Sequence, residues 1–328
     1  MHCLAADIGG TKTHLALYRD SVTQRIKEKK FASQEYDSFQ NILKEFLQDI
    51  SVKIDIACIA IAGPIVNQTC RTTNLPWTIE ADQLKQVFHF PFVVLLNDLE
   101  AQGYGIQALS KEEFLIINKG KPVEKKPRAI IAAGTGLGEA GAVWGNNQYH
   151  LFASEGGHVD FSPRNEREIE LLRFLIKKYK HVSWERVLSG PGIYELYLFL
   201  VEKENKEVSK EVLSAFKHAP PQDVITEFGV KNKDRLCVEI IDWFLSLYGC
   251  EAGNLALKYL PLNGLFIGGG IVLNLLDKIK EKNFIKAFLD KGRFARVLQD
   301  IPVKIILNGQ CALTGAAYYG FQTKNLSE

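Results

Sequence analysis

The segment DIGGTKT, residues 7–13, places a carboxylate, two glycines and hydroxyl groups next to one another. Asp7 stands at the end of an apolar run, and Gly9, Gly10 and Thr11 follow it. Glycine allows the backbone to approach a phosphate closely, so that N–H groups point at its oxygens. Asp7 could then hold Mg²⁺ through a water molecule beside those phosphates. The alternative is a simple hairpin turn, which needs the glycines but has no use for a buried carboxylate.

A second glycine-rich segment, AAGTGLGEAG (132–141), repeats this pattern with Gly134, Thr135 and Gly136. It does not match a dinucleotide-binding fingerprint, because the third required glycine position is Glu139 and the residues that follow alternate like a strand. The sequence also contains no Gly-Lys-Ser/Thr P-loop. Two such turns could grip one polyphosphate from two sides, and two unrelated tight turns remain the alternative.

Asn97 and Asp98 end the apolar run FVVLLND (92–98) with an amide and a carboxylate. Asn97 is followed three residues later by Glu100, a spacing that is typical of a helix capping box. A carboxylate at the carboxyl end of a strand is also well placed to act as a general base on a substrate. The local sequence is compatible with both interpretations.

Glu155, His158 and Asp160 gather around two glycines in SEGGHVDF (154–161). Such a group is usually a structural hydrogen-bond network, and a metal site would need more ligands. The same side chains could instead exchange hydrogen bonds with the hydroxyls of a polyol. Further along, Glu185 lies early in a helix that we expect to begin at Ser183, where the helix dipole alone would explain a glutamate.

The elements that position these residues alternate between strands and helices, which predicts an α/β layer architecture. The repeated strand–glycine turn–strand pattern near residues 5 and 132 also predicts a duplicated domain. The basic segment 118–128 is expected to be a solvated loop near a domain junction. We expect strands at 3–9, 14–20, about 22–31, 54–64, 92–98, 264–271 and 301–307, two strands within 129–145, and helices at 38–50, 167–180, 184–188, 234–259 and 311–320.

Composition narrows the functional classes. The 328 residues are 46% hydrophobic and 24% charged, as in an ordinary globular protein. A formal charge of +2 argues against a nucleic-acid-binding surface, and no basic segment followed by an apolar one suggests a secretory signal. No charge-free apolar run reaches the ~20 residues of a membrane span. Six scattered cysteines are expected to be buried free thiols in a reducing cytoplasm.

Taken together and in order, six segments closely resemble the bacterial glucokinases of the hexokinase/actin-like ATPase superfamily. The segments are DIGGTKT, LLND, GTGLG, EGGHVDF, VSWERVLSGPG and FIGGGI, and they span nearly the whole chain. The resemblance implies an α/β fold of two actin-like (ribonuclease H-like) domains with an interdomain cleft. The small domain would comprise residues 1–108 plus the C-terminal helix, about 309–328, and the large domain residues 109–308 with helical insertions.

The resemblance also implies an activity, transfer of the γ-phosphoryl group of ATP to the 6-hydroxyl of glucose with Mg²⁺, and a homodimer. Asp98 would be the catalytic base, and the glucose ligands would be Asn97, Asp98, Glu155, His158, Glu185 and Gly136. ATP would contact Gly9, Gly10, Thr11, Lys12, Gly134, Thr135, Gly136, Gly268, Gly269 and Gly270, and Asp7 would hold Mg²⁺ through water.

Lys12 departs from the resemblance, because these glucokinases usually carry Asn after GGT, whereas the related ROK kinases often carry Lys. The cysteine-rich zinc motif of ROK kinases does not follow His158. Two alternatives to glucokinase therefore remain: an ROK-like kinase of another hexose or amino sugar, and a sugar-sensing regulator without turnover. The intact Asp7 and Asp98, and the lack of an N-terminal helix-turn-helix segment, favour an enzyme.

Overall fold

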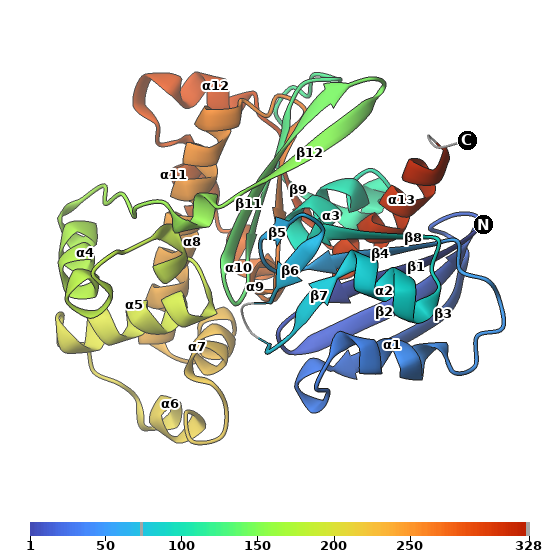
Figure 1. Ribbon diagram of the computed structural model, residues 1–328. Coiled ribbons are helices and arrows are strands. Elements are labelled where there is room, and N and C mark those ends of the chain that lie inside the picture. The colour runs from blue at the N-terminus through green and yellow to red at the C-terminus, as the bar shows by residue number, and fades with distance from the viewer. Residues whose placement is uncertain (73–74, 326–328) are drawn as a thin grey trace. The chain divides into compact units, whose positions relative to one another are not determined.

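The computed structural model describes residues 1–72 and 75–325, so the last three residues of the expected C-terminal helix, 326–328, lie outside the described part. The chain forms two compact units (Figure 1). The first unit contains residues 1–113 and 151–153 and the chain from residue 308 onward. The second unit contains residues 114–150 and 154–307.

The first unit is built around a five-stranded sheet with the order β3-β2-β1-β4-β8. β2 is antiparallel to β1 and β3, whereas β1, β4 and β8 run parallel. A small three-stranded sheet, which the sequence analysis did not predict, follows β4. The bounds are β1 (His2–Ile8), β2 (Lys12–Arg19), β3 (Arg25–Ala32), β4 (Ile56–Ile61), β8 (Phe92–Asn97), and, in the small sheet, β5 (Ile65–Val66), β6 (Thr69–Arg71) and β7 (Thr78–Glu80).

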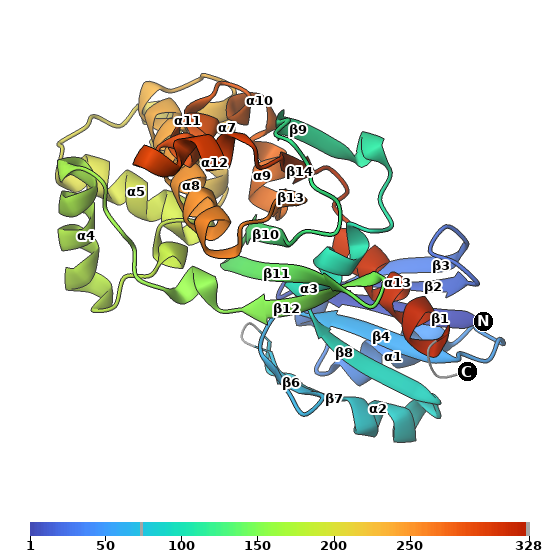
Figure 2. The ribbon, with the colours of Figure 1, turned by 90° about the horizontal axis from the view of Figure 1, so that it is seen from above.

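Helices cover both faces of the first sheet (Figure 2). On β1, Leu4 and Ala6 point to the face packed by α1 (Phe39–Leu47) and α2 (Ala81–Phe88). Cys3 and Ala5 point to the opposite face, against α3 (Asp98–Gly105) and α13 (Cys311–Asn325). Because side chains alternate along a strand, Asp7 faces the same side as Cys3 and Ala5.

The second unit repeats this topology. Its six-stranded sheet has the order β12-β11-β10-β13-β14-β9, and β10 pairs antiparallel with β11 and parallel with β13, as β1 does with β2 and β4. This correspondence is what the duplicated glycine hairpin predicts. The bounds are β9 (Phe114–Asn118), β10 (Arg128–Ala133), β11 (Leu137–Gly145), β12 (Gln148–Ser154), β13 (Gly264–Gly268) and β14 (Val303–Ile306).

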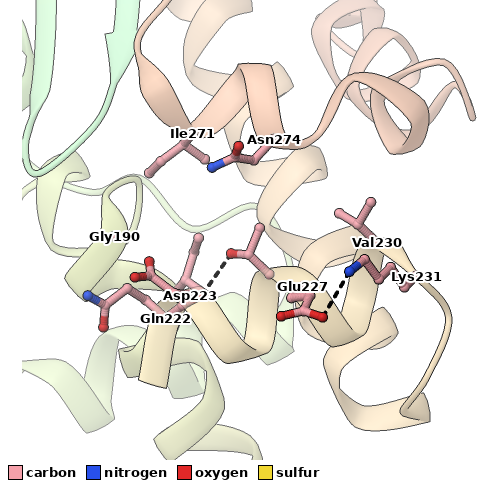
Figure 3. A pocket seen from close by; sticks show the side chains of 10 residues that line it. Gly190, Gln222, Asp223, Glu227, Val230, Lys231, Ile271 and Asn274 are labelled. Carbon is pink, nitrogen blue, oxygen red and sulfur yellow. Dashed lines mark hydrogen bonds and ion pairs between the residues drawn. The ribbon is translucent and has the colours of Figure 1, made fainter. Parts of the chain in front are cut away.

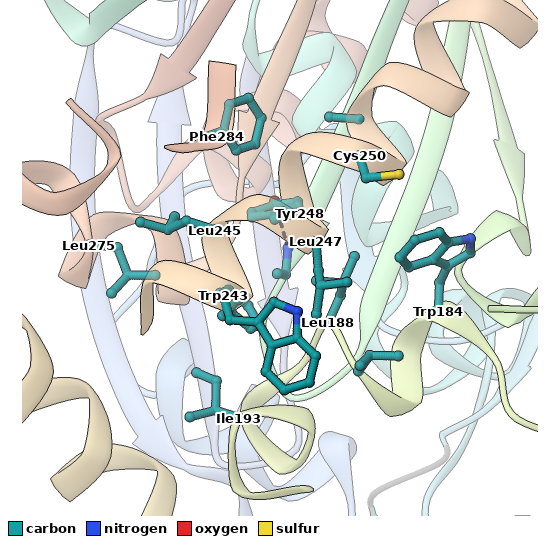
Figure 4. Packing of buried hydrophobic residues seen from close by; sticks show 14 of the residues in the cluster. Trp184, Leu188, Ile193, Trp243, Leu245, Leu247, Tyr248, Cys250, Leu275 and Phe284 are labelled. Atoms are coloured by element: carbon teal, nitrogen blue, oxygen red, sulfur yellow. Dashed lines mark hydrogen bonds between the residues drawn. The ribbon is translucent and has the colours of Figure 1, made fainter. Parts of the chain in front are cut away.

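The core of the second unit is organised around the 25-residue helix α8 (Arg235–Tyr259). Figure 4 shows Trp243 and Leu247 of this helix packed near Leu188 and Ile193. Asp234 caps its first turn by accepting a hydrogen bond from Cys237 N at 2.9 Å. The other helices are α4 (Glu166–Tyr179), α5 (Gly190–Glu202), α6 (Lys210–Ala215), α7 (Pro221–Val230), α9 (Gly270–Asn274), α10 (Leu276–Ile279), α11 (Asn283–Leu289) and α12 (Ala295–Gln299).

One helix boundary was predicted wrongly. SGPG was expected to stop a helix at 184–188, but that segment forms only a 3₁₀ turn, Trp184–Arg186, and SGPG begins α5. Ser189 is the N-cap and accepts a hydrogen bond from Gly192 N at 3.1 Å, while a proline in the first turn needs no N–H partner. All six cysteines are buried and unpaired, as expected. Within the described residues, no helix is both long and apolar enough to cross a membrane.

Candidate active site

The first glycine turn is held in a defined shape by hydrogen bonds. Gly9 N donates to Lys12 O at 2.9 Å, and Ser33 Oγ donates to Gly9 O at 2.9 Å. The same Ser33 hydroxyl lies 2.9 Å from Thr13 Oγ1. Thr11 and Lys12 are exposed at the tip of this turn. Backbone amides in a fixed, accessible glycine turn are suited to an anion.

Asp7 is the last residue but one of β1, beside this turn, and burial raises the pKa of its carboxyl from 3.8 to about 6. Its side chain has no basic partner among residues 1–72 and 75–325. Asp7 pairs with Ala60 on β4, and the next residue of β4, Ile61, pairs with Asn97 on β8. Asp7 and Asn97 therefore lie near the carboxyl ends of two parallel strands that are separated by β4. The distance between them is about 10 Å.

The capping interpretation of Asn97 is confirmed. Asn97 Oδ1 accepts a hydrogen bond from Leu99 N at 2.9 Å, and Glu100 Oε2 accepts one from Asn97 N at 3.2 Å. Asn97 Nδ2 also donates to Gly63 O at 3.2 Å. Asp98 is the first residue of α3, is half-buried, and accepts from Leu99 N at 2.9 Å. Capping thus explains the Asn97–Glu100 pair, but it does not require a carboxylate at Asp98.

The second glycine turn lies beside the glycines at the end of β13. Gly134 N donates to Gly136 O at 2.8 Å and closes the turn between β10 and β11. Gly268 pairs with Ala132, and Gly269 adopts a φ of 89°, where a Cβ would collide with the carbonyl of Ala133. Only glycine satisfies both conditions at this position. The two glycine segments that the family resemblance assigns to ATP are therefore adjacent within the second unit.

A carboxylate–imidazole cluster adjoins this turn. His158 Nε2 lies 3.8 Å from Glu155 Oε2, and His158 Nδ1 lies 3.9 Å from Glu185 Oε1. Glu185 Oε2 in turn accepts a hydrogen bond from Leu137 N at 3.0 Å, directly after Gly136. Glu155 and His158 are 71% and 56% exposed, so their polar atoms remain available to a ligand. Donors and acceptors on three neighbouring side chains suit the hydroxyl groups of a sugar.

Two chain segments that carry this cluster are joined like a short antiparallel ladder. Phe161 N donates to Val182 O at 2.9 Å, and Trp184 N donates to Val159 O at 3.0 Å. The Phe161 and Trp184 rings also meet edge to face. This pairing fixes Glu185 relative to His158. The third member expected from the sequence, Asp160, turns away, and its Oδ1 lies 3.3 Å from His181 Nδ1.

A pocket of about 350 Å³ adjoins both glycine segments of the second unit (Figure 3). Gly190, whose N–H donates to Gly134 O at 2.9 Å, lines it on one side, and Ile271, the residue after Gly270, lines it on the other. This pocket could not be predicted from the sequence, because its residues come from three separate helices and carry no motif. Its walls are Gly190, Ile193, Gln222, Asp223, Thr226, Glu227, Val230, Lys231, Ile271 and Asn274.

The pocket combines apolar and polar side chains. Ile193, Val230 and Ile271 supply apolar surface. At the rim, Glu227 Oε1 lies 2.9 Å from the Nζ atoms of both Lys231 and Lys233. These two ammonium groups lower the pKa of Glu227 to about 2. A cavity that combines apolar surface with a few polar groups that can fix a ligand's orientation is typical of a small-molecule or cofactor site.

No group of three or more metal-ligating side chains occurs in the described parts of the chain. A hydrated Mg²⁺ usually keeps several waters and takes one or two carboxylates from the protein. The single carboxylate of Asp7 would therefore be enough to hold it. The raised pKa of Asp7 fits such a role, because a bound cation would stabilise the ionised carboxylate that burial disfavours.

Comparisons with known proteins agree with this arrangement. A family model described as Glucokinase matches residues 4–323. A curated glucokinase of Nostoc sp. is 42% identical over 96% of this chain and 97% of its own length. A glucokinase of Escherichia coli is 35% identical, covering 98% of each chain.

Solved structures give the same result. The crystal structure of a glucokinase from an Antarctic psychrotroph matches with a TM-score of 0.82 at 30% identity, over 98% of this chain and 99% of that one. A ROK family glucokinase from Streptomyces griseus, solved with glucose and AMPPNP, matches with a TM-score of 0.67 at 20% identity over 98% and 100%, which supports the fold alone. The expected actin-like α/β fold is thus confirmed. The chain belongs to the glucokinase family.

Proposed function

We propose that this chain, an ATP-dependent hexose kinase, transfers the γ-phosphoryl group of ATP to the 6-hydroxyl of glucose, giving glucose 6-phosphate and ADP. The observation that carries the proposal is the placement of His158 between Glu155 and Glu185, beside the Gly136 turn. That arrangement offers a polyol several hydrogen bonds, and the chain's family membership supplies the reaction class.

The sugar is assigned to Asn97, Asp98, Gly136, Glu155, His158 and Glu185. Asp98 accepts the proton of the 6-hydroxyl as its oxygen attacks the γ-phosphorus, and the bond from that phosphorus to the β–γ bridging oxygen breaks, releasing ADP. Asn97 Nδ2 retains one amide hydrogen beyond its bond to Gly63 O. This hydrogen can be donated to a sugar hydroxyl without loss of the cap, which uses the side-chain oxygen.

The nucleotide is assigned to the glycine segments and the pocket. Backbone amides of Gly9, Gly10 and Thr11 and of Gly134, Thr135 and Gly136 bind phosphate oxygens, with Lys12 adding a positive charge. The adenosine occupies the pocket that begins at Ile271, after Gly268, Gly269 and Gly270. Mg²⁺, held through water by Asp7, would neutralise phosphate charge when bound.

The remaining assignments rest on the family resemblance. The small domain comprises residues 1–108 with the C-terminal helix, about 309–328, and the large domain residues 109–308; the extent of the first unit supports this division. We also propose a homodimer and a cytoplasmic location.

The decisive experiment measures ADP release by the purified chain with ATP and Mg²⁺, first without sugar and then with glucose, mannose, fructose, N-acetylmannosamine or glucosamine. A large stimulation by glucose, abolished by EDTA, is expected. Greater kcat/KM with another sugar would favour the ROK-like alternative. Glucose binding by calorimetry without ADP release under any condition would favour the sugar-sensing regulator.

A further inference from the structure

Glu139 is a buried carboxyl group for which the proposed reaction has no use. It lies on β11, pairs with Ile131 of β10 and is only 2% exposed. Its side chain meets that of Glu251 on α8, which is fully buried. Two carboxyl groups in contact inside a protein cannot both ionise at moderate cost.

The surroundings of the pair supply little compensation for a second negative charge. The polar groups that face Glu139 are Glu251, the Tyr248 hydroxyl and the more distant Lys258 on α8, and Ser154 at the end of β12. Lys258 Nζ lies 3.5 Å from Glu251 Oε1 and is half-exposed. Glu251 also accepts a hydrogen bond from Asn254 Nδ2 at 2.7 Å, so it is the better placed of the two to carry the charge.

In the described part of the chain, Glu139 has no contact like those that Glu251 makes with the Asn254 amide and the Lys258 ammonium group. Its Oε1 is buried and finds no hydrogen-bond partner within the described chain. Two ionised carboxylates offer only acceptors, so a proton on Glu139 is what allows it to bond to Glu251. Burial first, and then the charge of Glu251, raise the pKa of Glu139 from 4.5 to about 8.

The Glu139 side chain also supports the turn that carries the sugar cluster. A Cβ on Gly156 would collide with Glu139 Oε2, so the turn Glu155–His158 rests directly on this carboxyl group. Ser154 joins the two segments as well, since its hydroxyl donates to Glu139 O at 3.2 Å and accepts from Gly156 N at 3.3 Å.

We propose that Glu139, in its protonated form and bonded to Glu251, is a positioning residue that holds the Glu155–His158 turn in its glucose-binding geometry. This inference rests on the proposed function. Ionisation of Glu139 places a second negative charge against Glu251 and displaces the turn, which weakens glucose binding without removing any group from the sugar.

The test compares Glu139→Gln and Glu139→Ala with the parent protein between pH 6 and 9.5. In the parent, the KM for glucose should rise above about pH 8 relative to its value at pH 7, while the KM for ATP changes less. Glu139→Gln keeps the shape and the hydrogen-bond donor but cannot ionise. Its KM for glucose should therefore equal that of the parent at pH 7 and should not rise above about pH 8. Glu139→Ala removes the support and should raise the KM for glucose about tenfold at pH 7.

Glu195→Gln is the matched control. Glu195 is also a buried glutamate of the second unit, 4% exposed, but it accepts hydrogen bonds from Tyr179 and Lys178 and does not support Gly156. Its substitution should lower Tm yet leave the pH dependence of the KM for glucose as in the parent. If Glu195→Gln and Glu139→Gln change that dependence alike, or if neither Glu139 variant changes it, the inference is wrong.

A second measurement needs no turnover. Because the folded pKa of Glu139 lies above its unfolded value, folding takes up a proton, and the resulting destabilisation grows as pH rises from about 4.5 to 8. The Tm of Glu139→Gln should therefore exceed that of the parent at pH 7.5, and the difference should shrink at pH 5. If the difference in Tm between Glu139→Gln and the parent does not change with pH, Glu139 is not protonated in the folded protein. Absence of glucose phosphorylation in the parent would count against the proposed function instead.

Discussion

Glu185 Oε2 accepts a hydrogen bond from the backbone amide of Leu137 at 3.0 Å, and this bond ties the sugar cluster to the second glycine turn. The contact is close, because a Cβ on Gly136 would collide with the same carboxylate oxygen. A residue expected to orient glucose and a turn expected to meet phosphate therefore share one hydrogen bond. A substitution that displaces the turn at this point should therefore weaken glucose binding first.

Gly136→Ala should raise the KM for glucose about tenfold or more, because the new methyl group displaces the Glu185 carboxylate from Leu137 N. Gly134→Ala is the matched control in the same turn, since a Cβ there meets no atom within 4 Å. Its Tm should stay within about 2 °C of the parent and its KM for glucose should be unchanged. Equal glucose kinetics in both variants would show that Glu185 does not bind the sugar.

Asp98→Asn should leave glucose binding measurable by calorimetry while kcat falls by about two orders of magnitude or more, the scale of a lost general base. Glu100→Gln provides the control, because it removes a charge from the same first turn of α3 and weakens the capping box. Its kcat should remain within about twofold of the parent. If kcat and Tm fall together in both variants, Asp98 stabilises α3 and does not take part in the reaction.

The sequence predicts well those features that depend on neighbouring residues. The Asn97–Glu100 capping box is one, because three residues of spacing determine it. The two glycine hairpins are another, although the sequence alone did not reveal the order of the strands on which they lie. That order depends on pairing between strands far apart in the chain, such as β4 with β8, which no local pattern encodes.

Features built from distant residues were missed or misjudged. The pocket at Ile271 draws on α5, α7 and α9, and Gln222 and Thr226 carry no signal of their own. Glu139 entered the sequence analysis only as a mismatch to a dinucleotide fingerprint, because its partner Glu251 is distant in sequence. Asp160 was grouped with His158 by proximity, but strand pairing with Ser183 directs it toward His181.

His158→Ala should weaken glucose binding by about fivefold to a hundredfold, the equivalent of hydrogen bonds worth ~1–3 kcal/mol, as measured by calorimetry. His150→Ala removes an imidazole elsewhere in the chain, whose Nε2 lies 3.0 Å from the carbonyl oxygen of Gly145, and it should leave glucose affinity unchanged. Parent-like affinity in His158→Ala, or a bound zinc ion that disappears with the imidazole, would rule out the polyol interpretation.

Lys12→Asn should raise the KM for ATP several-fold at low ionic strength and leave the KM for glucose unchanged. The reason is the position of Lys12, which is exposed on the tip of the Gly9–Lys12 turn and makes no ion pair with any described residue. Its ammonium group is therefore available as a point charge for a phosphate. Because salt screens exposed charges, the difference between the two proteins should shrink as ionic strength rises.

The control for this variant is Lys53→Asn, which removes an exposed lysine just before β4, at the opposite end of the same sheet from the turn. It should leave the kinetics for both substrates as in the parent at every salt concentration, because a general change in surface charge has no directed effect on bound phosphate. If Lys12→Asn behaves like Lys53→Asn at low salt, the ammonium group of Lys12 points to solvent. An asparagine at this position, as the family resemblance leads one to expect, would then be equivalent to Lys12, and the phosphates would depend on the backbone amides of Gly9, Gly10 and Thr11 alone.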